Sequence, residues 1–340
     1  MVLFGKPRRV IKIINIIVPM YKARDTLPDL LDSFVTQTKK RFFITLVNDA
    51  DGEDYSDIIE KYSNRGLHIN YLINPKNGGP GAARQYGLDH NKMCDYVAFC
   101  DADDMVTPQY VELLYDHAKA VGADVVMSPI YVEKKHGISS MITIDKGVTW
   151  LHGKAYRYDY LKNNDIRFYE GIRYNEDGGF NNLALNMTDK LLKLEFPLYL
   201  WRDYKGSLTR VDRLDFTKMG SWQHIYCCLN SCIRLIEQGY IKEDKLIDFI
   251  QAYVNVAYNF YQIILAVNGD HGNIEELIKE FLHKDYVQQI LKSKNSIRKI
   301  LKKIKISEII DKKLYIFKDS FFDWIKEFGD VDLIQNYNFS

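Results

Sequence analysis

The stretch VAFCDADDMV, Val97 to Val106, joins a short apolar run to three carboxylates, Asp101, Asp103 and Asp104. An apolar run of this length, bounded by polar residues, is typical of a buried strand. The carboxylates repel one another unless solvent or a positive charge compensates them. Hard divalent cations such as Mg²⁺ prefer oxygen ligands, so a D-x-D pair at a strand end suits a metal-nucleotide site.

Two other interpretations fit the same stretch. Acidic residues favour helix N-termini, so the cluster also fits a solvated turn before the next helix. A strand followed by DxDx[TV] is the nucleophile loop of haloacid-dehalogenase-type phosphatases, in which the first Asp attacks phosphorus. This chain has Met105 at the position of Thr or Val, and the motif follows three predicted strands. The stretch alone leaves all three interpretations open.

Composition predicts a globular protein whose partners bind at particular sites and are not attracted by the overall charge. The chain has 340 residues, 46% of them hydrophobic, and a net charge of +1. A balanced charge does not predict nucleic-acid binding by the whole molecule. The five cysteines form no paired framework and no secretory signal is recognisable, so we expect a cytoplasmic location. Apolar runs such as Ile13 to Val18 are far shorter than the roughly 20 residues of a spanning helix, which leaves peripheral attachment to the inner membrane surface open.

The first part of the chain alternates between strand-like and helix-like segments. The predicted strands are 11–18, 42–47, 68–73, 96–100 and 123–128, and helical patterns separate them. This alternation predicts parallel βαβ units, which bind ligands beyond the carboxyl ends of their strands, where Asp49 and Asp101 lie. From Asp215 the pattern is mostly helical. We therefore expect an α/β domain over residues 1–214 and a helical domain over 215–340, which serves acceptor binding or oligomerisation.

Five motifs occur in order along the first part of the chain. They are IIVPMYKARDTLPDLLDSFVTQT, ITLVNDADGEDY, NPKNGGPGAARQYGL, YVAFCDADDMVTPQYV and RYNEDGGFNNLAL. In order and spacing this set resembles the family 2 glycosyltransferases, and the resemblance covers roughly residues 10 to 210. It implies a GT-A fold, a Rossmann-like mixed and mainly parallel sheet flanked by helices. It also implies an inverting, metal-dependent transfer of a sugar from a nucleotide donor.

The resemblance implies a nucleotide site built from several motifs. Pro19 and Tyr21 match positions that line the nucleobase, and Asp49 matches a carboxylate that accepts a hydrogen bond from the base, which favours UDP. The other matched nucleotide-binding positions are Gly79, Arg84, Asp101, Ala102, Arg202 and Ser207, of which the last two belong to WRDYKGSLTR, Trp201 to Arg210.

The resemblance also implies the metal and the base. Asp103, with Asp101, matches the ligands of Mn²⁺ or Mg²⁺, and Asp104 assists through water. Asp177 matches the general base, and its neighbour Glu176 contacts the acceptor or orients the loop. An isolated NED motif also fits an acidic helix N-terminus.

The acceptor is not specified by any motif. A glycan, a cell-wall polymer, a protein and a modified nucleic acid all remain possible acceptors. Assembly of the chain into a homo-oligomer is also possible. A basic amphipathic segment beginning at Ser293 either contacts a polyanion or membrane surface, or is a packed helix with a solvated face. A noncatalytic nucleotide-sugar or polyanion-binding protein on the same fold is the alternative function.

Overall fold

The computed structural model describes residues 13–90, 94–134, 137–142, 150–204, 213–303, 307–309, 312–314 and 318–331. The chain divides into two compact units, and each is described by itself. The sheet unit comprises Met1–Gly171 and Thr188–Tyr204, and the helical unit comprises Ile172–Met187 and Lys205–Ser340. The functional division predicted at residue 214 stays a prediction.

The sheet unit contains the alternating elements that the sequence predicts. Its described strands are β1 Ile14–Met20, β2 Phe42–Asn48, β3 Ile69–Ile73, β4 Tyr96–Phe99, β5 Met105–Val106, β6 Val125–Met127, β7 Ile130–Lys134, β8 Gly137–Ile142, β9 Lys154–Arg157, β10 Leu191–Lys193 and β11 Tyr199–Trp201. Its described helices are α1 Leu27–Val35, α2 Ser56–Asn64, α3 Pro80–Asp89, α4 Tyr110–Val121 and α5 Tyr158–Asn163.

The main sheet has seven strands in the order β10-β6-β9-β4-β1-β2-β3. All neighbouring pairs are parallel except those of β9, which runs antiparallel to β4 and β6. This mixed, mainly parallel sheet confirms the predicted fold class. Because β1 lies between β2 and β4, the carboxyl ends of these three strands meet at one edge of the sheet, and Asp49 and Asp101 lie just beyond that edge.

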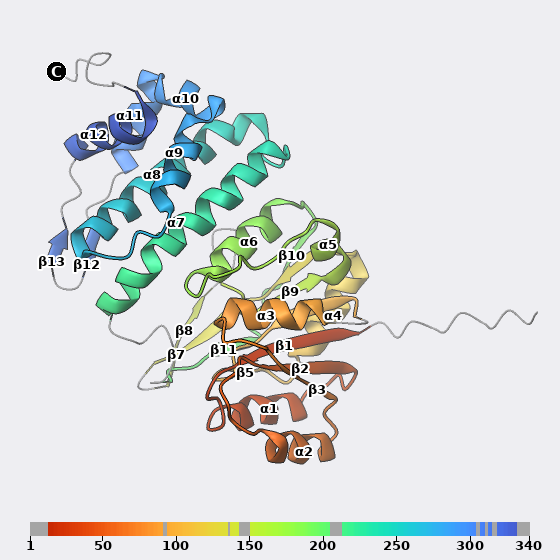
Figure 1. The fold of residues 1–340 in the computed structure, drawn as a ribbon. Coiled ribbons are helices and arrows are strands. Elements are labelled where there is room, and N and C mark those ends of the chain that lie inside the picture. Colours follow the sequence, from red (N-terminus) through yellow and green to blue (C-terminus); the bar gives the residue numbers. More distant parts are fainter. Residues whose placement is uncertain are drawn as a thin grey trace, which may run out of the picture. The chain divides into compact units, whose positions relative to one another are not determined.

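Apolar patterning explains these elements. Apart from Asn15, β1 consists of apolar, mostly β-branched residues, and it is buried along nearly its whole length, as expected for a central strand covered on both faces. In α1, Pro28 occupies the first turn, where its missing N–H costs nothing, and Leu27, Leu30, Leu31 and Phe34 are buried. Figure 1 shows α1 and α2 on one face of the sheet and α3 on the other.

A second, four-stranded sheet has the order β5-β11-β7-β8. β5 begins directly after the acidic cluster and pairs antiparallel with β11, with Tyr199 opposite Val106. The pairing brings residues near 200 to the carboxyl end of β4.

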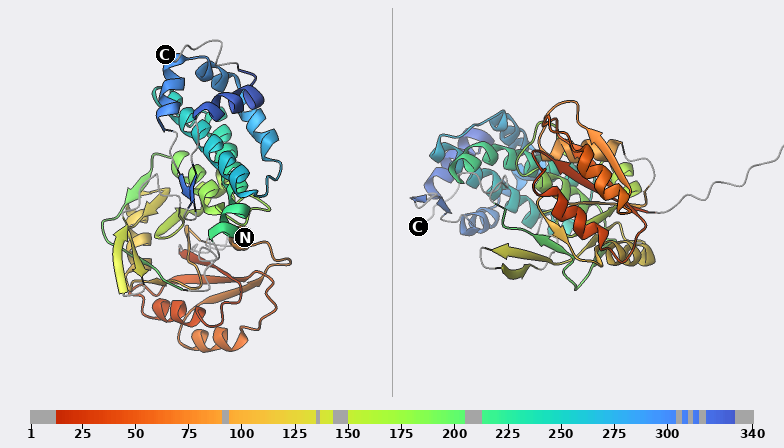
Figure 2. Two further views of the ribbon diagram at one scale, coloured as in Figure 1. Left: turned by 90° about the vertical axis from the view of Figure 1, so that its left-hand side faces the viewer. Right: turned by 90° about the horizontal axis from the view of Figure 1, so that it is seen from below.

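The helical unit contains α6 Glu176–Asn186, α7 Arg213–Glu237, α8 Glu243–Val267, α9 Ile274–His283, α10 Asp285–Leu291, α11 Lys294–Lys303 and α12 Lys318–Gly329, with the strands β12 Ser307–Ile309 and β13 Lys312–Leu314. Helices α7 and α8 pack along each other (Figure 2). The predominance of helix after residue 213 confirms the expected helical C-terminal region. None of the helices in the described ranges combines the length and the apolar character that crossing a membrane requires.

The basic segment predicted from Ser293 includes α11. Its Ile297, Ile300 and Leu301 are buried in the core of the helical unit, while Arg298 and Lys299 are exposed. α11 is therefore a packed helix with a solvated basic face. Its contact with a polyanion or a membrane stays a prediction.

Candidate active site

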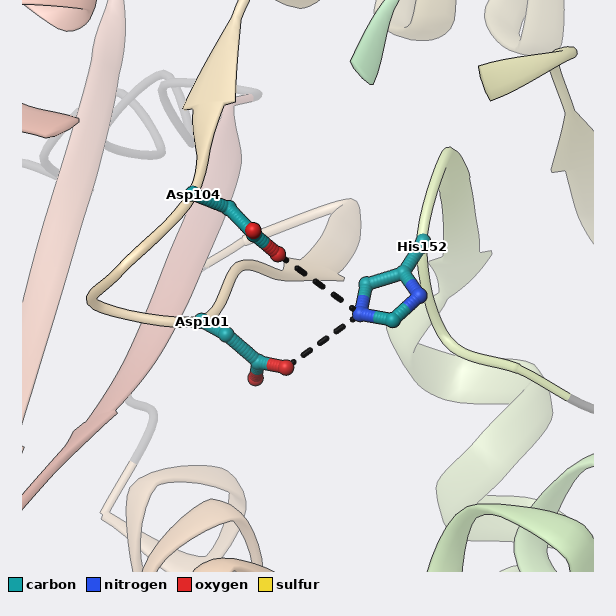
Figure 3. Close-up of side chains that lie close together, drawn as sticks. All are labelled: Asp101, Asp104 and His152. Atoms are coloured by element: carbon teal, nitrogen blue, oxygen red, sulfur yellow. Dashed lines mark hydrogen bonds and ion pairs between the residues drawn. The ribbon is translucent and has the colours of Figure 1, made fainter. Parts of the chain in front are cut away.

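The acidic cluster forms a tight turn at the carboxyl end of β4. The backbone N–H of Asp104 donates to the carbonyl of Asp101 at 3.2 Å, which closes the turn. A turn of this kind brings its first and fourth residues close together. Figure 3 shows the carboxylates of Asp101 and Asp104 directed at the same ring nitrogen of His152. The distances from His152 Nε2 are 3.2 Å to Asp101 Oδ2 and 3.7 Å to Asp104 Oδ2.

His152 reaches the turn from the segment before β9. Its ring stacks on that of Trp201 at 5.6 Å between centroids and lies 4.9 Å from that of Tyr199. The next residue, Gly153, has φ +68°, and a Cβ atom there would lie 2.7 Å from the carbonyl oxygen of Ser128. Only glycine fits this backbone position. The turn at Gly153 therefore sets the direction of the backbone at His152.

Arg84 on α3 supplies positive charge to the turn. Its guanidinium donates to Asp101 Oδ1 at 2.6 Å, and the residue is only 5% exposed. Burial by itself raises the pKa of Asp101, but the charge of Arg84 and the hydrogen bond from His152 outweigh it and hold the pKa below its usual range. Asp101 is therefore an ionised, partly neutralised carboxylate.

Asp104 is almost completely buried, at 1% exposure. Its Oδ2 accepts a hydrogen bond from the Tyr199 hydroxyl at 2.6 Å, and its Oδ1 accepts one from the backbone N–H of Arg202 at 2.8 Å. Burial raises the pKa of Asp104 to about 7; nearby His152 opposes this shift and Asp101 and Asp103 add to it. Burial and the charge of Asp101 also raise the pKa of Asp103. The raised pKa values of Asp103 and Asp104 thus reflect burial and the crowding of three carboxylates in one turn.

A divalent cation fits this donor set. Among the residues that the structure describes, Asp101, Asp104 and His152 form the group of His, Cys, Asp and Glu side chains whose ligand atoms lie within 4.8 Å of one another. Mg²⁺ takes oxygen ligands, whereas transition-metal dications accept imidazole beside carboxylates. The two carboxylates suit Mg²⁺ and Mn²⁺ alike, and the imidazole adds a nitrogen ligand of the kind that transition-metal dications accept. Asp103, which the sequence favours as the direct ligand, is not a member of this group.

Asp49, at the end of β2, holds the glycine-rich turn before α3. Its buried carboxylate accepts hydrogen bonds from Asn74 Nδ2 at 2.8 Å, from the backbone N–H of Gly78 at 3.1 Å and from that of Gly79 at 2.7 Å. The structure thus gives Asp49 a local role that its motif did not indicate. Its contact with a nucleobase stays a prediction.

The remaining positions predicted to bind nucleotide have different surroundings. Tyr21, just after β1, is 55% exposed, whereas Pro19 is half-buried and Ala102 is buried in the acidic turn. Arg202 donates from Nη1 to Asp29 at 2.8 Å, so its side chain is held against α1. Ser207 lies outside the described residues.

Glu176 and Asp177 form the first turn of α6 in the helical unit. Glu176 is buried, and Asp177 Oδ1 accepts a hydrogen bond from the backbone N–H of Gly178 at 2.8 Å. Because they belong to the other compact unit, their place relative to the acidic turn stays a prediction.

His152 and Tyr199 are site residues that the sequence motifs did not indicate. Asp101 and His152 are 51 positions apart, and Asp104 and Tyr199 are 95 positions apart. The sequence contains no local pattern that indicates His152 or Tyr199. For Asp104 such a pattern exists, because the Asp-x-x-Asp spacing of Asp101 and Asp104 across a turn predicts that their side chains converge.

Comparison with known proteins identifies the fold and the family. A model described as "Glycosyl transferase family 2" matches residues 15–173. The glycosyltransferase GlyA of Streptococcus pneumoniae serotype 4 is 30% identical over 221 residues, which are 58% of this chain and 32% of GlyA. The chain thus spans about a third of the length of GlyA.

Two solved structures share the fold. S. aureus TarS in complex with UDP-GlcNAc matches with a TM-score of 0.57 and 19% identity, over 81% of this chain and 87% of that one. The mannosyltransferase PcManGT from Pyrobaculum calidifontis, in complex with GDP-Man and Mn²⁺, matches with a TM-score of 0.50 and 10% identity, over 95% of this chain and 86% of that one. The sheet unit has the GT-A type of fold, and residues 15–173 of this chain belong to the glycosyl transferase family 2.

Proposed function

We propose that the chain is a metal-dependent, inverting glycosyltransferase that moves a sugar from a UDP-sugar to an acceptor hydroxyl. The observation that carries this proposal is the convergence of Asp101, Asp104 and His152 at the carboxyl edge of a family 2 sheet. Ligands of open α/β sheets bind at this edge. The nucleotide sugars bound by TarS and PcManGT, which share the fold, support a nucleotide-sugar donor.

Asp101, Asp104 and His152 would hold Mn²⁺, with Mg²⁺ as the weaker fit. When bound, the cation supplies positive charge to the leaving diphosphate. Arg84 stabilises Asp101 from the protein side, and Tyr199 and the Arg202 backbone orient Asp104. Asp103, at the tip of the same turn, remains a candidate for a contact with the donor or its metal.

The donor would lie along the carboxyl ends of β1, β2 and β4. Tyr21 presents an exposed aromatic face after β1, on which a uracil ring can stack. Gly78 and Gly79 bring backbone close to the site, held by Asp49. Pro19, Ala102, Arg202 and Ser207 complete the proposed nucleotide site.

Asp177 is the proposed general base, and Glu176 is its proposed helper. Inversion needs the acceptor hydroxyl to attack opposite the departing diphosphate while a carboxylate accepts its proton. Both residues lie in the first turn of α6, where the helix dipole favours negative charge. The acceptor is a glycan, a cell-wall polymer, a protein or a modified nucleic acid, and we place the reaction in the cytoplasm.

A screen of donors and acceptors, carried out with the unsubstituted chain and with the Asp177→Asn variant, tests the proposal. Mass spectrometry after incubation of nucleotide sugars with each acceptor class, with and without Mn²⁺, should reveal one sugar added to one acceptor. Asp177→Asn should abolish the transfer and retain UDP binding, measured by calorimetry. UDP binding without transfer to any acceptor would instead indicate a noncatalytic binding protein. Phosphate release from simple esters would indicate a phosphatase if the single substitution Asp101→Asn abolished that release.

A further inference from the structure

The loop Arg173–Asn175, which leads into α6, is held by its backbone against the side chain of Gln223 on α7. The backbone N–H groups of Arg173 and Tyr174 both donate to Oε1 of Gln223, at 2.7 Å and 2.9 Å. Gln223 is 6% exposed, and its Nε2 donates to the carbonyl of Met219 at 3.2 Å. The amide of Gln223 is thus held by its own helix and directed at two consecutive donors of the loop.

A second contact fastens the last residue of the loop. Asn175 has φ +59°, a left-handed conformation, and its Nδ2 donates to the carbonyl of Gly220 at 3.2 Å. A Cβ atom at Gly220 would lie 3.3 Å from Cβ of Tyr174, so the small residue allows the loop to approach α7 closely. Positions 220 and 223 are one turn apart on α7 and share a face. One face of α7 therefore holds three consecutive loop residues.

Helix α6 begins directly from this anchored loop. The carbonyl of Asn175 accepts hydrogen bonds from the backbone N–H groups of Gly178 at 3.1 Å and Gly179 at 3.4 Å. Further along α6, Asn182 Nδ2 donates to Ser231 Oγ on α7 at 3.0 Å. The segment that carries Glu176 and Asp177 is thus attached to α7 before and after those residues.

We propose that α7 is a positioning element for Asp177 and that Gln223 is its principal positioning residue. This inference rests on the proposed role of Asp177 as general base. It gives the C-terminal helices a part in the reaction, in addition to acceptor binding or oligomerisation. A displacement of about 1 Å of a reacting group can slow a reaction by about 100-fold, so an anchor of this kind affects turnover without touching substrate.

Gln223→Met tests the proposal, because methionine keeps the length of the side chain and removes the acceptor oxygen. Two quantities are measured in the full chain: the hydrogen exchange of the Arg173 and Tyr174 amides, and the kcat and donor KM for UDP release from a UDP-sugar. We expect faster exchange at both amides and a kcat reduced by about 10- to 100-fold, with a donor KM within about threefold of the original value.

Gln288→Met is the matched control. Gln288 is a half-buried glutamine of the helical unit, and its Nε2 donates to the carbonyls of Leu282 at 2.8 Å and Gly329 at 2.9 Å. Its substitution should leave the exchange of the two loop amides and the kcat unchanged. Asn175→Gly keeps access to positive φ and removes the hydrogen bond to Gly220. It should change the amide exchange and the kcat in the same direction as Gln223→Met. This second variant replaces Gln223→Met in the test if Gln223→Met does not fold.

The outcomes separate this proposal from the one on which it rests. Unchanged amide exchange in Gln223→Met, or faster exchange with unchanged kcat, would overturn the positioning role. Full turnover by Asp177→Asn would show that the base was assigned wrongly, whatever Gln223→Met does to the loop.

Discussion

The hydroxyl of Tyr199 donates a hydrogen bond to Oδ2 of Asp104 at 2.6 Å and accepts one from the backbone N–H of Asp101 at 3.1 Å. One atom of β11 therefore ties together the first and last residues of the acidic turn. Asp104 cannot rotate away from His152 without losing this bond. The orientation of the proposed metal site thus depends on a tyrosine that lies 95 positions from Asp104 in the sequence.

Tyr199→Phe should weaken metal binding more than it disturbs the fold. The variant keeps the buried ring and removes the donor to Asp104, which costs about 1–3 kcal/mol of unfolding free energy. Loss of an orienting partner of a ligand typically weakens metal binding by about 10- to 100-fold. Calorimetric titration with Mn²⁺ and urea unfolding measure the two effects. Tyr96→Phe is the control, because its buried hydroxyl donates to the carbonyls of Ala118 and Ala123 and has no contact with Asp104. Equal Mn²⁺ affinity in both variants would refute the orienting role.

His152 should be visible as a nitrogen ligand of bound Mn²⁺. Pulsed electron paramagnetic resonance of the Mn²⁺-loaded protein should show coupling to a ¹⁴N nucleus. His152→Gln should lose the coupling and bind Mn²⁺ at least about tenfold more weakly, because a ligand contributes no less than its supporting partners. His117→Gln, an exposed histidine substitution on α4, should retain both properties. Mn²⁺ bound tightly without nitrogen coupling would restrict the site to carboxylates.

Arg84→Met should destabilise the protein, and Mn²⁺ should reverse part of the loss. Removing one partner of a fully buried ion pair costs about 3–5 kcal/mol. The Asp101 side chain is 32% exposed and keeps its contact with His152, so we expect a smaller loss here. A cation bound at the turn supplies the missing positive charge to Asp101. Thermal unfolding should therefore show a larger Mn²⁺-induced rise in Tm for Arg84→Met than for the unsubstituted chain. Arg24→Met, which breaks the exposed pair with Asp57, should show a much smaller loss and no additional response to Mn²⁺. An equal rise in Tm in all three proteins would show that Mn²⁺ does not bind beside Asp101.

Asp49→Asn should reduce stability as well as nucleotide binding. The substitution turns one acceptor oxygen into a donor, which then faces the N–H groups of the glycine-rich turn or Asn74. Leaving such a buried donor without a partner costs about 1–3 kcal/mol. Urea unfolding measures this cost, and UDP titration measures the effect on the site. A variant as stable as the original chain that binds UDP more weakly would indicate that Asp49 contacts the base and does not hold the turn.

The sequence was sufficient for the elements that hold the edge of the sheet. β1, β2 and β4 are mostly apolar and mostly buried, with Asn15, Thr45 and Asn48 as the polar exceptions. Such short apolar segments are recognised without knowledge of the tertiary structure. β9 was not predicted. Its residues KAYR include the fully buried Lys154, and its place in the sheet depends on antiparallel pairing with β4 and β6.

The candidate site was predictable only in part for the same reason. Motif order indicates Asp101, Asp49 and Arg84, and the structure places Arg84 against Asp101. His152 follows no periodicity or motif, since its role comes from a turn at Gly153 and a stack on Trp201. The anchoring of the NED segment on Gln223 likewise depends on a long-range contact, at a separation of 50 positions from Arg173.

Metal dependence of the proposed transfer is measured by the rate of UDP release from a panel of UDP-sugars, after metal removal with EDTA and again across a titration with Mn²⁺. We expect no release without metal, and saturable release with Mn²⁺ from at least one UDP-sugar, at a lower rate with Mg²⁺. In Asp101→Asn and His152→Gln the Mn²⁺ concentration for half-maximal release should rise. Release at full rate in EDTA, or an identical Mn²⁺ dependence in the variants, would contradict the claim that Asp101, Asp104 and His152 form the metal site of a glycosyltransferase.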